Sequence, residues 1–307
     1  MKKILLVFSV LITTVSLTGQ KADTIPGPWK FQGMTSYTYS QVSLVNWAQC
    51  GDNNSAFNGI ALLNLYYTKN KSSWTNTLDM GYGTQKVDGR ASGKTDDHFD
   101  FLSKYGYKTG KNWYISVLLD IRSQFTEGYK VTSDTSRTLI SDFMSPGYLQ
   151  LALGMEYKPN DKFYFMLSPI GVRETFVLND SLSAHGAFGV DPGKKIRTEM
   201  GASARISITH DLMKNVTLTT SMDLFSNLLD KPQNVDVNWR ALIDMKINKF
   251  LSANFSLAMV YDDNIKSVDN EGVVHGPKIQ LKELIGVGFS FKFISTQRNP
   301  NLRKKEI

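Results

Sequence analysis

The chain has 307 residues, of which 41% are hydrophobic and 21% charged, with a formal net charge of +7 and a single cysteine. One cysteine excludes a framework of internal disulfides. Beyond the first 20 residues, no segment has the roughly 18 uninterrupted apolar residues that a transmembrane helix requires. The small basic excess gives little support for nucleic-acid binding, and we expect no nucleic acid among the partners.

The N-terminus reads MKKILLVFSVLITTVSLTGQ, in which Lys2 and Lys3 precede a short apolar run. This is the layout of a secretory signal peptide. The alternative, a membrane-anchoring helix, is disfavoured because the run is too short to cross roughly 30 Å of hydrocarbon. We therefore expect residues 1–19 to be removed on export.

After residue 30 the dominant pattern is alternation between apolar and polar residues. In WYISVLLDIRSQF, for example, Ile115, Val117 and Leu119 fall on one face, whereas Asp120 and Arg122 fall on the other. A period of two predicts a β-strand with one apolar face. About twelve such segments begin near residues 30, 55, 73, 98, 112, 147, 162, 196, 215, 235, 250 and 279.

These segments run for about ten to fifteen residues, whereas strands of soluble proteins usually have about five or six. Alternation does not say which face points inward, and a soluble barrel with an apolar interior also alternates. The connections discriminate, because short ones such as KTGKN and KPNDK alternate with long ones such as residues 127–147. This favours an all-β, transmembrane, antiparallel up-and-down β-barrel of about 12 strands, with short periplasmic turns and long extracellular loops.

The resulting domain organisation has four parts. Residues 1–19 are the signal peptide, 20–29 a short N-terminal segment, 30–293 the outer-membrane barrel and 294–307 a basic periplasmic tail. The long loop 86–97 is expected between the third and fourth strands. Cys50 is expected to be a free thiol in the first outer loop.

Aromatic residues flank the short turns. We expect these residues to form an aromatic girdle at the membrane interface, where an apolar ring and a polar tip are both satisfied. The alternative is ordinary packing at hairpin ends. The predicted interface residues are Tyr105, Tyr107, Trp113, Tyr114, Tyr157, Phe163 and Tyr164.

Charged residues on the polar faces of the strands are candidates for lining the lumen, since a lipid-facing Arg or Lys at mid-depth costs about 2–4 kcal/mol. They are Asp79, Asp120, Arg122, Glu199, Arg205, Asp223, Arg240 and Asp244. Such residues either fill and rigidify a narrow barrel or form a polar path for a small solute. Their mixed signs argue against strong selection by charge.

Two places resist strict alternation. Glu283 shares the apolar face of its strand, which requires a bulge or a position at the outer rim. Arg173 and Glu174 cannot both face inward, and the nearby Pro169 and Gly171 indicate a bulge.

Candidates for chemistry are few. His98, His185 and His275 lie in or beside predicted loops and His210 at a short turn, with no serine placed predictably against any of them. The acidic residues 262–271 lack the spacing of a calcium-binding EF-hand. We therefore expect no enzymatic activity, no cofactor and no metal.

Several segments occur in the order typical of one family: SLVNWAQCGDNN, KTDDHFDFLSKYGYK, GMEYKPNDKFYFMLSP, DKPQNVDVNW and MKINKFLSANFSLAMVYDDNIK. The chain resembles the family of Gram-negative outer-membrane proteins catalogued as domain of unknown function three-thousand-seventy-eight. The resemblance covers nearly all of the chain after the signal peptide. It implies an outer-membrane barrel and no particular activity.

The function predicted from these observations is a narrow channel or transporter for small polar solutes. The first alternative is a non-conducting structural or docking subunit of an outer-membrane assembly, and an outer-membrane enzyme is a distant one. The expected partners are outer-membrane lipid, a small polar solute and an envelope protein.

Overall fold

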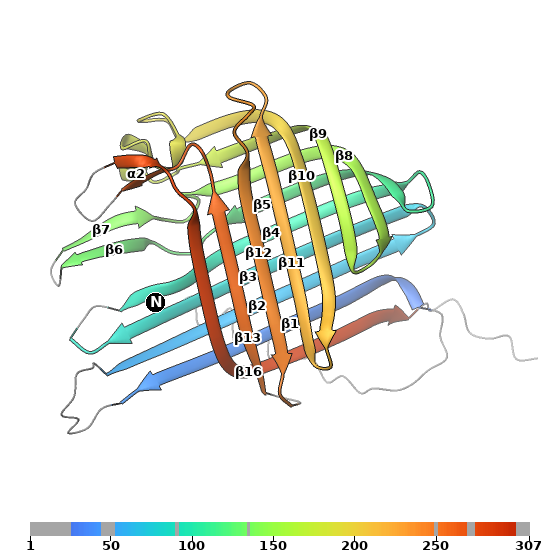
Figure 1. Cartoon of the computed structure of the whole chain (residues 1–307), viewed down its shortest axis with the longest axis horizontal. Coiled ribbons are helices and arrows are strands. Elements are labelled where there is room, and N and C mark those ends of the chain that lie inside the picture. Colours follow the sequence, from blue (N-terminus) through green and yellow to red (C-terminus); the bar gives the residue numbers. More distant parts are fainter. Residues whose placement is uncertain are drawn as a thin grey trace, which may run out of the picture.

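Twelve long antiparallel strands close into one barrel in the computed structural model (Figure 1). The structure describes residues 26–43, 53–89, 92–133, 136–248, 251–268 and 274–298, so the predicted signal peptide and Cys50 lie outside the described residues. The barrel strands are β1 (Pro26–Val42), β2 (Asn54–Lys69), β3 (Ser72–Val87), β4 (Gly93–Lys108), β5 (Trp113–Ser123), β8 (Gly147–Asn160), β9 (Phe163–Phe176), β10 (Ile196–Met213), β11 (Val216–Asn227), β12 (Asp236–Lys246), β13 (Leu251–Tyr261) and β16 (Gln280–Arg298). The predicted fold class is confirmed.

The barrel closes where β1 pairs with β16, in a ladder that runs from Lys30–Thr296 to Thr38–Gly288. Closure removes both sheet edges, so every strand has two neighbours that satisfy its backbone N–H and C=O groups. β1 begins at Pro26 and β16 ends at Arg298, so the described strands extend beyond the barrel limits of 30 and 293 expected from the sequence.

The connections at the two ends of the barrel differ in length. At one end, β2–β3, β4–β5, β8–β9 and β10–β11 are joined by turns at residues 70–71, 109–112, 161–162 and 214–215, and only four residues separate β12 from β13. The other end carries two hairpins, β6 (Gly128–Ser133) with β7 (Ser136–Ser141) and β14 (Lys266–Val268) with β15 (Val274–Pro277), together with the short helices α2 (Asp180–Ala184) and η1 (Ala187–Gly189). Figure 1 shows β6, β7 and α2 together at this end. No helix among the described residues is long and apolar enough to cross a membrane.

The expected long loop at residues 86–97 is wrong, because β4 already begins at Gly93. The ladder between β3 and β4 continues through the pairs Gly81–His98 and Gly83–Asp96. A Cβ atom at Gly81 would lie 2.3 Å from the His98 ring and 2.6 Å from the Asp96 carboxylate. Glycine therefore lets two bulky polar side chains lie against β3, which extends the strand pairing beyond the predicted start.

The outer surface of the barrel carries an extensive apolar belt. Exposed aliphatic and aromatic side chains on it include Ile115, Val117, Leu151, Leu153, Met155, Leu167, Ile170, Ile285, Val287 and Phe289. A protein surrounded by water rarely exposes an apolar surface of this extent. The alternation seen in the sequence therefore places the apolar face outward, where hydrocarbon would cover it.

Strand β9 contains a bulge that changes which residues face inward. Its ladder with β10 skips from Ser203–Ser168 to Gly201–Gly171, so residues 169 and 170 oppose a single residue of β10. Before the bulge, Met166 and Ser168 are buried in the barrel, and beyond it Arg173 is buried whereas Glu174 is not. The extra residue therefore brings Arg173 into the interior and turns Glu174 outward.

Glu283 is accommodated by its position rather than by a bulge. The ladder between β13 and β16 is continuous from Leu251–Phe289 to Val260–Gln280. Glu283 is exposed near the beginning of β16, at the end of the barrel that carries the long connections. A carboxylate there avoids the middle of the apolar belt.

A charge introduced at the centre of the apolar belt should damage folding. Leu119 lies in the middle of β5, on the face opposite to Asp120, and pairs with Leu151 of β8. Leu119→Arg is expected to lower the free energy of unfolding in phospholipid vesicles by about 2–4 kcal/mol, because the guanidinium would enter hydrocarbon. Urea titration, with folded protein detected by its altered gel migration before boiling, measures this change.

The control places the same side chain on the same outer surface but at the rim. Glu283→Arg is expected to cost far less, since the penalty falls to roughly 0–1 kcal/mol near the interface. Equal losses in the two variants would contradict the assignment of the outer face.

Candidate functional site: a bridged polar lumen

An arginine spans the lumen from wall to wall. Arg240 lies on β12, and its Nη1 atom is 2.6 Å from Asp100 Oδ2 on β4 and 3.6 Å from Asp79 Oδ2 on β3. In the strand order, β12 and β4 are six strands apart in either direction, so they face each other across the barrel. The Arg240–Asp100 pair, called here the cross-lumen pair, therefore divides the interior.

A second group of charges lies beside the cross-lumen pair. Asp120 Oδ2 is 3.0 Å from Arg122 Nη2 and 3.1 Å from Arg205 Nη1, while Arg205 Nε is 3.2 Å from Asp223 Oδ1. The Asp120 side chain is almost fully buried, and its Oδ1 atom has no hydrogen-bond partner among the described residues. Charges buried in this way are stable only when they are paired, which these mostly are.

The other two lumen candidates lie in separate clusters. Glu199 Oε2 accepts hydrogen bonds from Arg173 Nε at 2.9 Å and from Arg197 Nη2 at 3.0 Å, and Arg173 also pairs with Asp236. Asp244 pairs with Lys292 of β16. The structure thus brings Asp79, Asp120, Arg122, Arg205, Asp223 and Arg240 into the middle of the lumen and leaves Glu199 and Asp244 apart from them.

Near the short turns lies a buried ion pair that the sequence analysis missed. Lys104 of β4 pairs with Glu156 of β8, and Ser116 donates a hydrogen bond of 2.7 Å to the same carboxylate. The Lys104 ammonium also lies 3.3 Å from the centroid of the Tyr164 ring. The sequence alternation could have indicated this pair, because Lys104 lies on the same face of its strand as Asp100 and Leu102.

His98 belongs to a chain of polar contacts inside the barrel. Its Nδ1 atom is 3.0 Å from Asp96 Oδ1 and its Nε2 atom is 3.4 Å from Asp79 Oδ1, while Lys282 Nζ is 2.5 Å from Asp96 Oδ1. The expectation that His98 is an ordinary loop histidine is therefore wrong. The cause is the early start of β4, which places His98 within a strand on its inward face.

The predicted aromatic girdle needs two corrections. Tyr105, Tyr107 and Trp113 are exposed on the outer surface. Tyr157 packs against Trp113 in a tilted arrangement, with ring centroids 5.0 Å apart, and edge-on against Phe163 at 6.5 Å. Tyr164 instead faces Lys104 inside the barrel. Tyr114 shares the inward face of β5 with Ser116, and both would contact a Cβ atom at Gly106. The interface prediction is wrong for Tyr114 and Tyr164 because alternation turns them away from lipid.

A cavity of about 260 Å³ occupies the part of the lumen nearer the long connections. Its lining includes Arg122, Arg173 and Arg240, together with Tyr148, Gln150, Phe225, Asn238 and the five carboxylates Asp97, Asp120, Asp223, Asp236 and Asp262. The cavity therefore combines charged side chains with apolar surface. It is large enough for a small solute.

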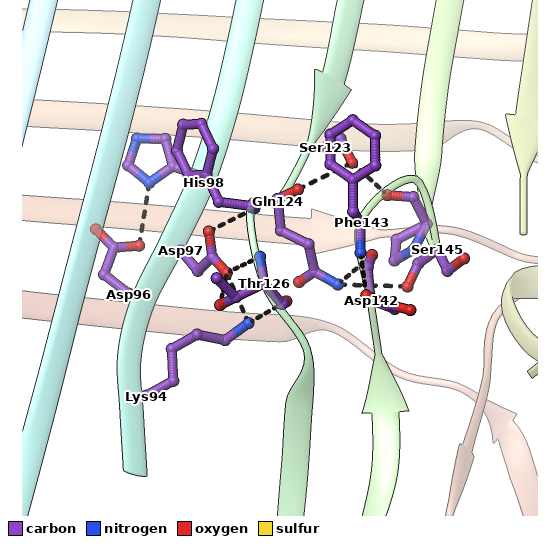
Figure 2. Close-up of polar contacts among 12 residues, drawn as sticks. Lys94, Asp96, Asp97, His98, Ser123, Gln124, Thr126, Asp142, Phe143 and Ser145 are labelled. Carbon is purple, nitrogen blue, oxygen red and sulfur yellow. Dashed lines mark hydrogen bonds and ion pairs between the residues drawn. The ribbon is translucent and has the colours of Figure 1, made fainter. Parts of the chain in front are cut away.

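One side of the cavity is held by the chain that leaves β5 (Figure 2). The Asp97 carboxylate accepts hydrogen bonds from the backbone N–H groups of Phe125 at 2.8 Å and Thr126 at 3.0 Å, and it pairs with Lys94 at 2.7 Å. Gln124 Nε2 donates to the backbone oxygen of Asp142 at 2.8 Å. These contacts tie both ends of the connection that carries β6 and β7 to the barrel rim.

Solved structures similar to this chain are bacterial membrane barrels at low sequence identity. They include the translocator domain of the autotransporter NalP from Neisseria meningitidis, at 10% identity and a TM-score of 0.38, with 95% of this chain and 94% of that chain covered. The COG4313 outer membrane channel from Pseudomonas putida F1 has 10% identity and a TM-score of 0.39, with 90% and 100% covered. The NanC porin has 9% identity and a TM-score of 0.37, with 84% and 98% covered.

Comparison with curated protein sequences finds no match. A family model does match part of the chain. Over residues 39–129 the chain matches the family described as Protein of unknown function (DUF3078), which confirms over that segment the family predicted from the sequence motifs.

Proposed function

We propose that this protein is an outer-membrane barrel that serves as a narrow channel or transporter for small polar solutes. The observation that carries the proposal is the cross-lumen pair, because a charged bridge between opposite walls leaves room only for small solutes. A barrel of about eight strands is filled by its side chains, whereas one of sixteen leaves an aqueous channel. With twelve strands, the inward side chains decide how much of the lumen is open.

The cavity supports transport over a purely structural role. A filled, rigid barrel has no need of a chamber of about 260 Å³ beside the cross-lumen pair. Catalysis has no comparable support, since His98 inside the barrel contacts Asp96 and Asp79 rather than a serine. The outer-membrane location rests on the apolar belt, which requires hydrocarbon.

Conductance measurements test this proposal. Purified protein in planar lipid bilayers is expected to give small or no steady conductance, because the cross-lumen pair obstructs the path. A matched bilayer containing a general porin provides the upper reference. Large, stable conductance steps from this protein would contradict a narrow lumen.

The alternative of a non-conducting subunit makes a different prediction. Extraction from native membranes in mild detergent would then yield a stoichiometric envelope partner together with an absence of conductance. Small conductance without such a partner favours the channel or transporter.

A further inference from the structure

Asp262 differs from the other carboxylates that line the cavity. Asp97 pairs with Lys94, Asp120 with Arg122 and Arg205, Asp223 with Arg205, and Asp236 with Arg173. Among the described residues, no Lys or Arg nitrogen lies within 4.0 Å of the Asp262 carboxylate. Asp262 is nevertheless only 6% exposed, and within the described residues its carboxylate accepts a single hydrogen bond, from the backbone N–H of Asn264 at 2.8 Å.

The neighbouring arginines do not make up for this missing cation, since each is already paired with at least one other carboxylate. Arg173 is shared by Glu199 and Asp236, Arg205 by Asp120 and Asp223, and Arg240 by Asp79 and Asp100. Among the side chains that line the cavity, the arginines are Arg122, Arg173 and Arg240, and the carboxylates are Asp97, Asp120, Asp223, Asp236 and Asp262. Three against five leaves a formal excess of two negative charges in the lining.

We propose that this cavity binds a small organic cation, with the ammonium group of the ligand at the Asp262 carboxylate. This proposal rests on the proposed function, of which it names the solute class. An ammonium group would donate hydrogen bonds to a buried carboxylate that now lacks a charged partner, and charge-assisted hydrogen bonds are among the strongest in proteins.

The rest of the lining suits a short organic cation better than a metal ion. Pro146, Phe225, Val237 and Val260 provide apolar surface for a carbon chain beside the carboxylates. No group of three or more His, Cys, Asp or Glu side chains within the described ranges is arranged to hold a metal ion. Anions are disfavoured because every lining arginine is already paired.

The protonation of Asp262 gives the proposal a pH dependence. Burial, followed by repulsion from Asp236, raises the pKa of the Asp262 carboxyl above its usual value, and Arg173 and Arg197 oppose the shift. Only the ionised carboxylate attracts a cation, so binding should be strongest where the Asp262 carboxyl is ionised. It should be lost as the pH falls through the raised pKa, before ordinary surface carboxyls titrate.

Binding of three probes of equal size tests the proposal. Propylammonium chloride, 1-propanol and sodium propionate differ mainly in charge, and their binding to purified protein in detergent can be followed by saturation-transfer NMR. We expect propylammonium to bind and the other two probes not to bind. Asp262→Asn should weaken propylammonium binding at least tenfold, because the amide keeps the shape and removes the charge.

Asp263→Asn is the matched control. Asp263 is the next residue in the chain, does not line the cavity and accepts a hydrogen bond from Asn234 Nδ2 at 2.5 Å. The Asp263→Asn variant should bind propylammonium as tightly as the unaltered protein does. Equal binding of the three probes, or unchanged binding in Asp262→Asn, would overturn the proposal.

The wild-type pH profile tests the same inference if Asp262→Asn does not fold. Propylammonium binding that persists unchanged from pH 7 to pH 4 would overturn it. If propylammonium does not bind but the conductance is small, the cation site is contradicted and the proposed channel still stands. If propylammonium binds but the conductance is large, the narrow lumen is contradicted and the cation site still stands.

Discussion

Replacing Arg240 and Asp100 together by serine is expected to raise the single-channel conductance severalfold. The double change removes the charged bridge between opposite walls and leaves the net charge unaltered, so the effect reports the width of the path. Recordings in planar bilayers at fixed salt measure it. The folded state is verified by gel migration before and after boiling.

The control removes an ion pair that does not cross the lumen. Lys292 and Asp244 pair between β16 and β12, which are separated in the barrel only by β13. Lys292→Ser combined with Asp244→Ser should leave conductance close to that of the unaltered protein. Equal increases in the two double variants, or none in either, would show that Arg240 does not limit the path.

Replacing Lys104 by methionine should cost about 3–5 kcal/mol, because it leaves a buried carboxylate without its cation. The side chains of Lys104 and Glu156 are 4% and 3% exposed, so water cannot take over the role of the missing partner. Lys104→Met combined with Glu156→Gln should recover most of this loss, since removing both charges leaves none uncompensated. Unfolding by urea in vesicles measures the three free energies.

An exposed ion pair provides the comparison for Lys104. The Lys162 and Asp211 side chains are 62% and 59% exposed at a short turn, with Nζ and Oδ2 2.7 Å apart. Solvent screens such a pair, so Lys162→Met should change the free energy of unfolding far less. A loss as large as that of Lys104→Met would point to a general effect of removing lysines.

The strands were largely predictable from the sequence because alternation is a local property. β2, β3 and β8 begin at Asn54, Ser72 and Gly147, within a residue of the expected positions. The bulge in β9 was signalled by Pro169 and Gly171. The start of β4 was predicted too late in the chain. The polar residues Asp96 and His98 resemble a loop in the sequence, and their pairing with Gly83 and Gly81 of β3 is visible only in the structure.

The contacts within the lumen were not predictable in the same way. Alternation says that Arg240 and Asp100 face inward, but not that they lie at the same height on opposite strands. That depends on barrel closure and on the tilt of every strand. Lys104 was missed because a lysine near a short turn is equally compatible with lipid head groups, and only its strand face decides between the two environments.

The bulge in β9 has a consequence for how the chain can change in length. In a strand, alternate residues face opposite sides, so the side on which a residue lies depends on the number of residues that precede it. The extra residue at Pro169 and Ile170 reverses this alternation for Arg173 and for the rest of β9. Gains or losses of a single residue within the strand therefore exchange its lipid and lumen faces, whereas paired gains or losses, or changes in the loops, preserve them.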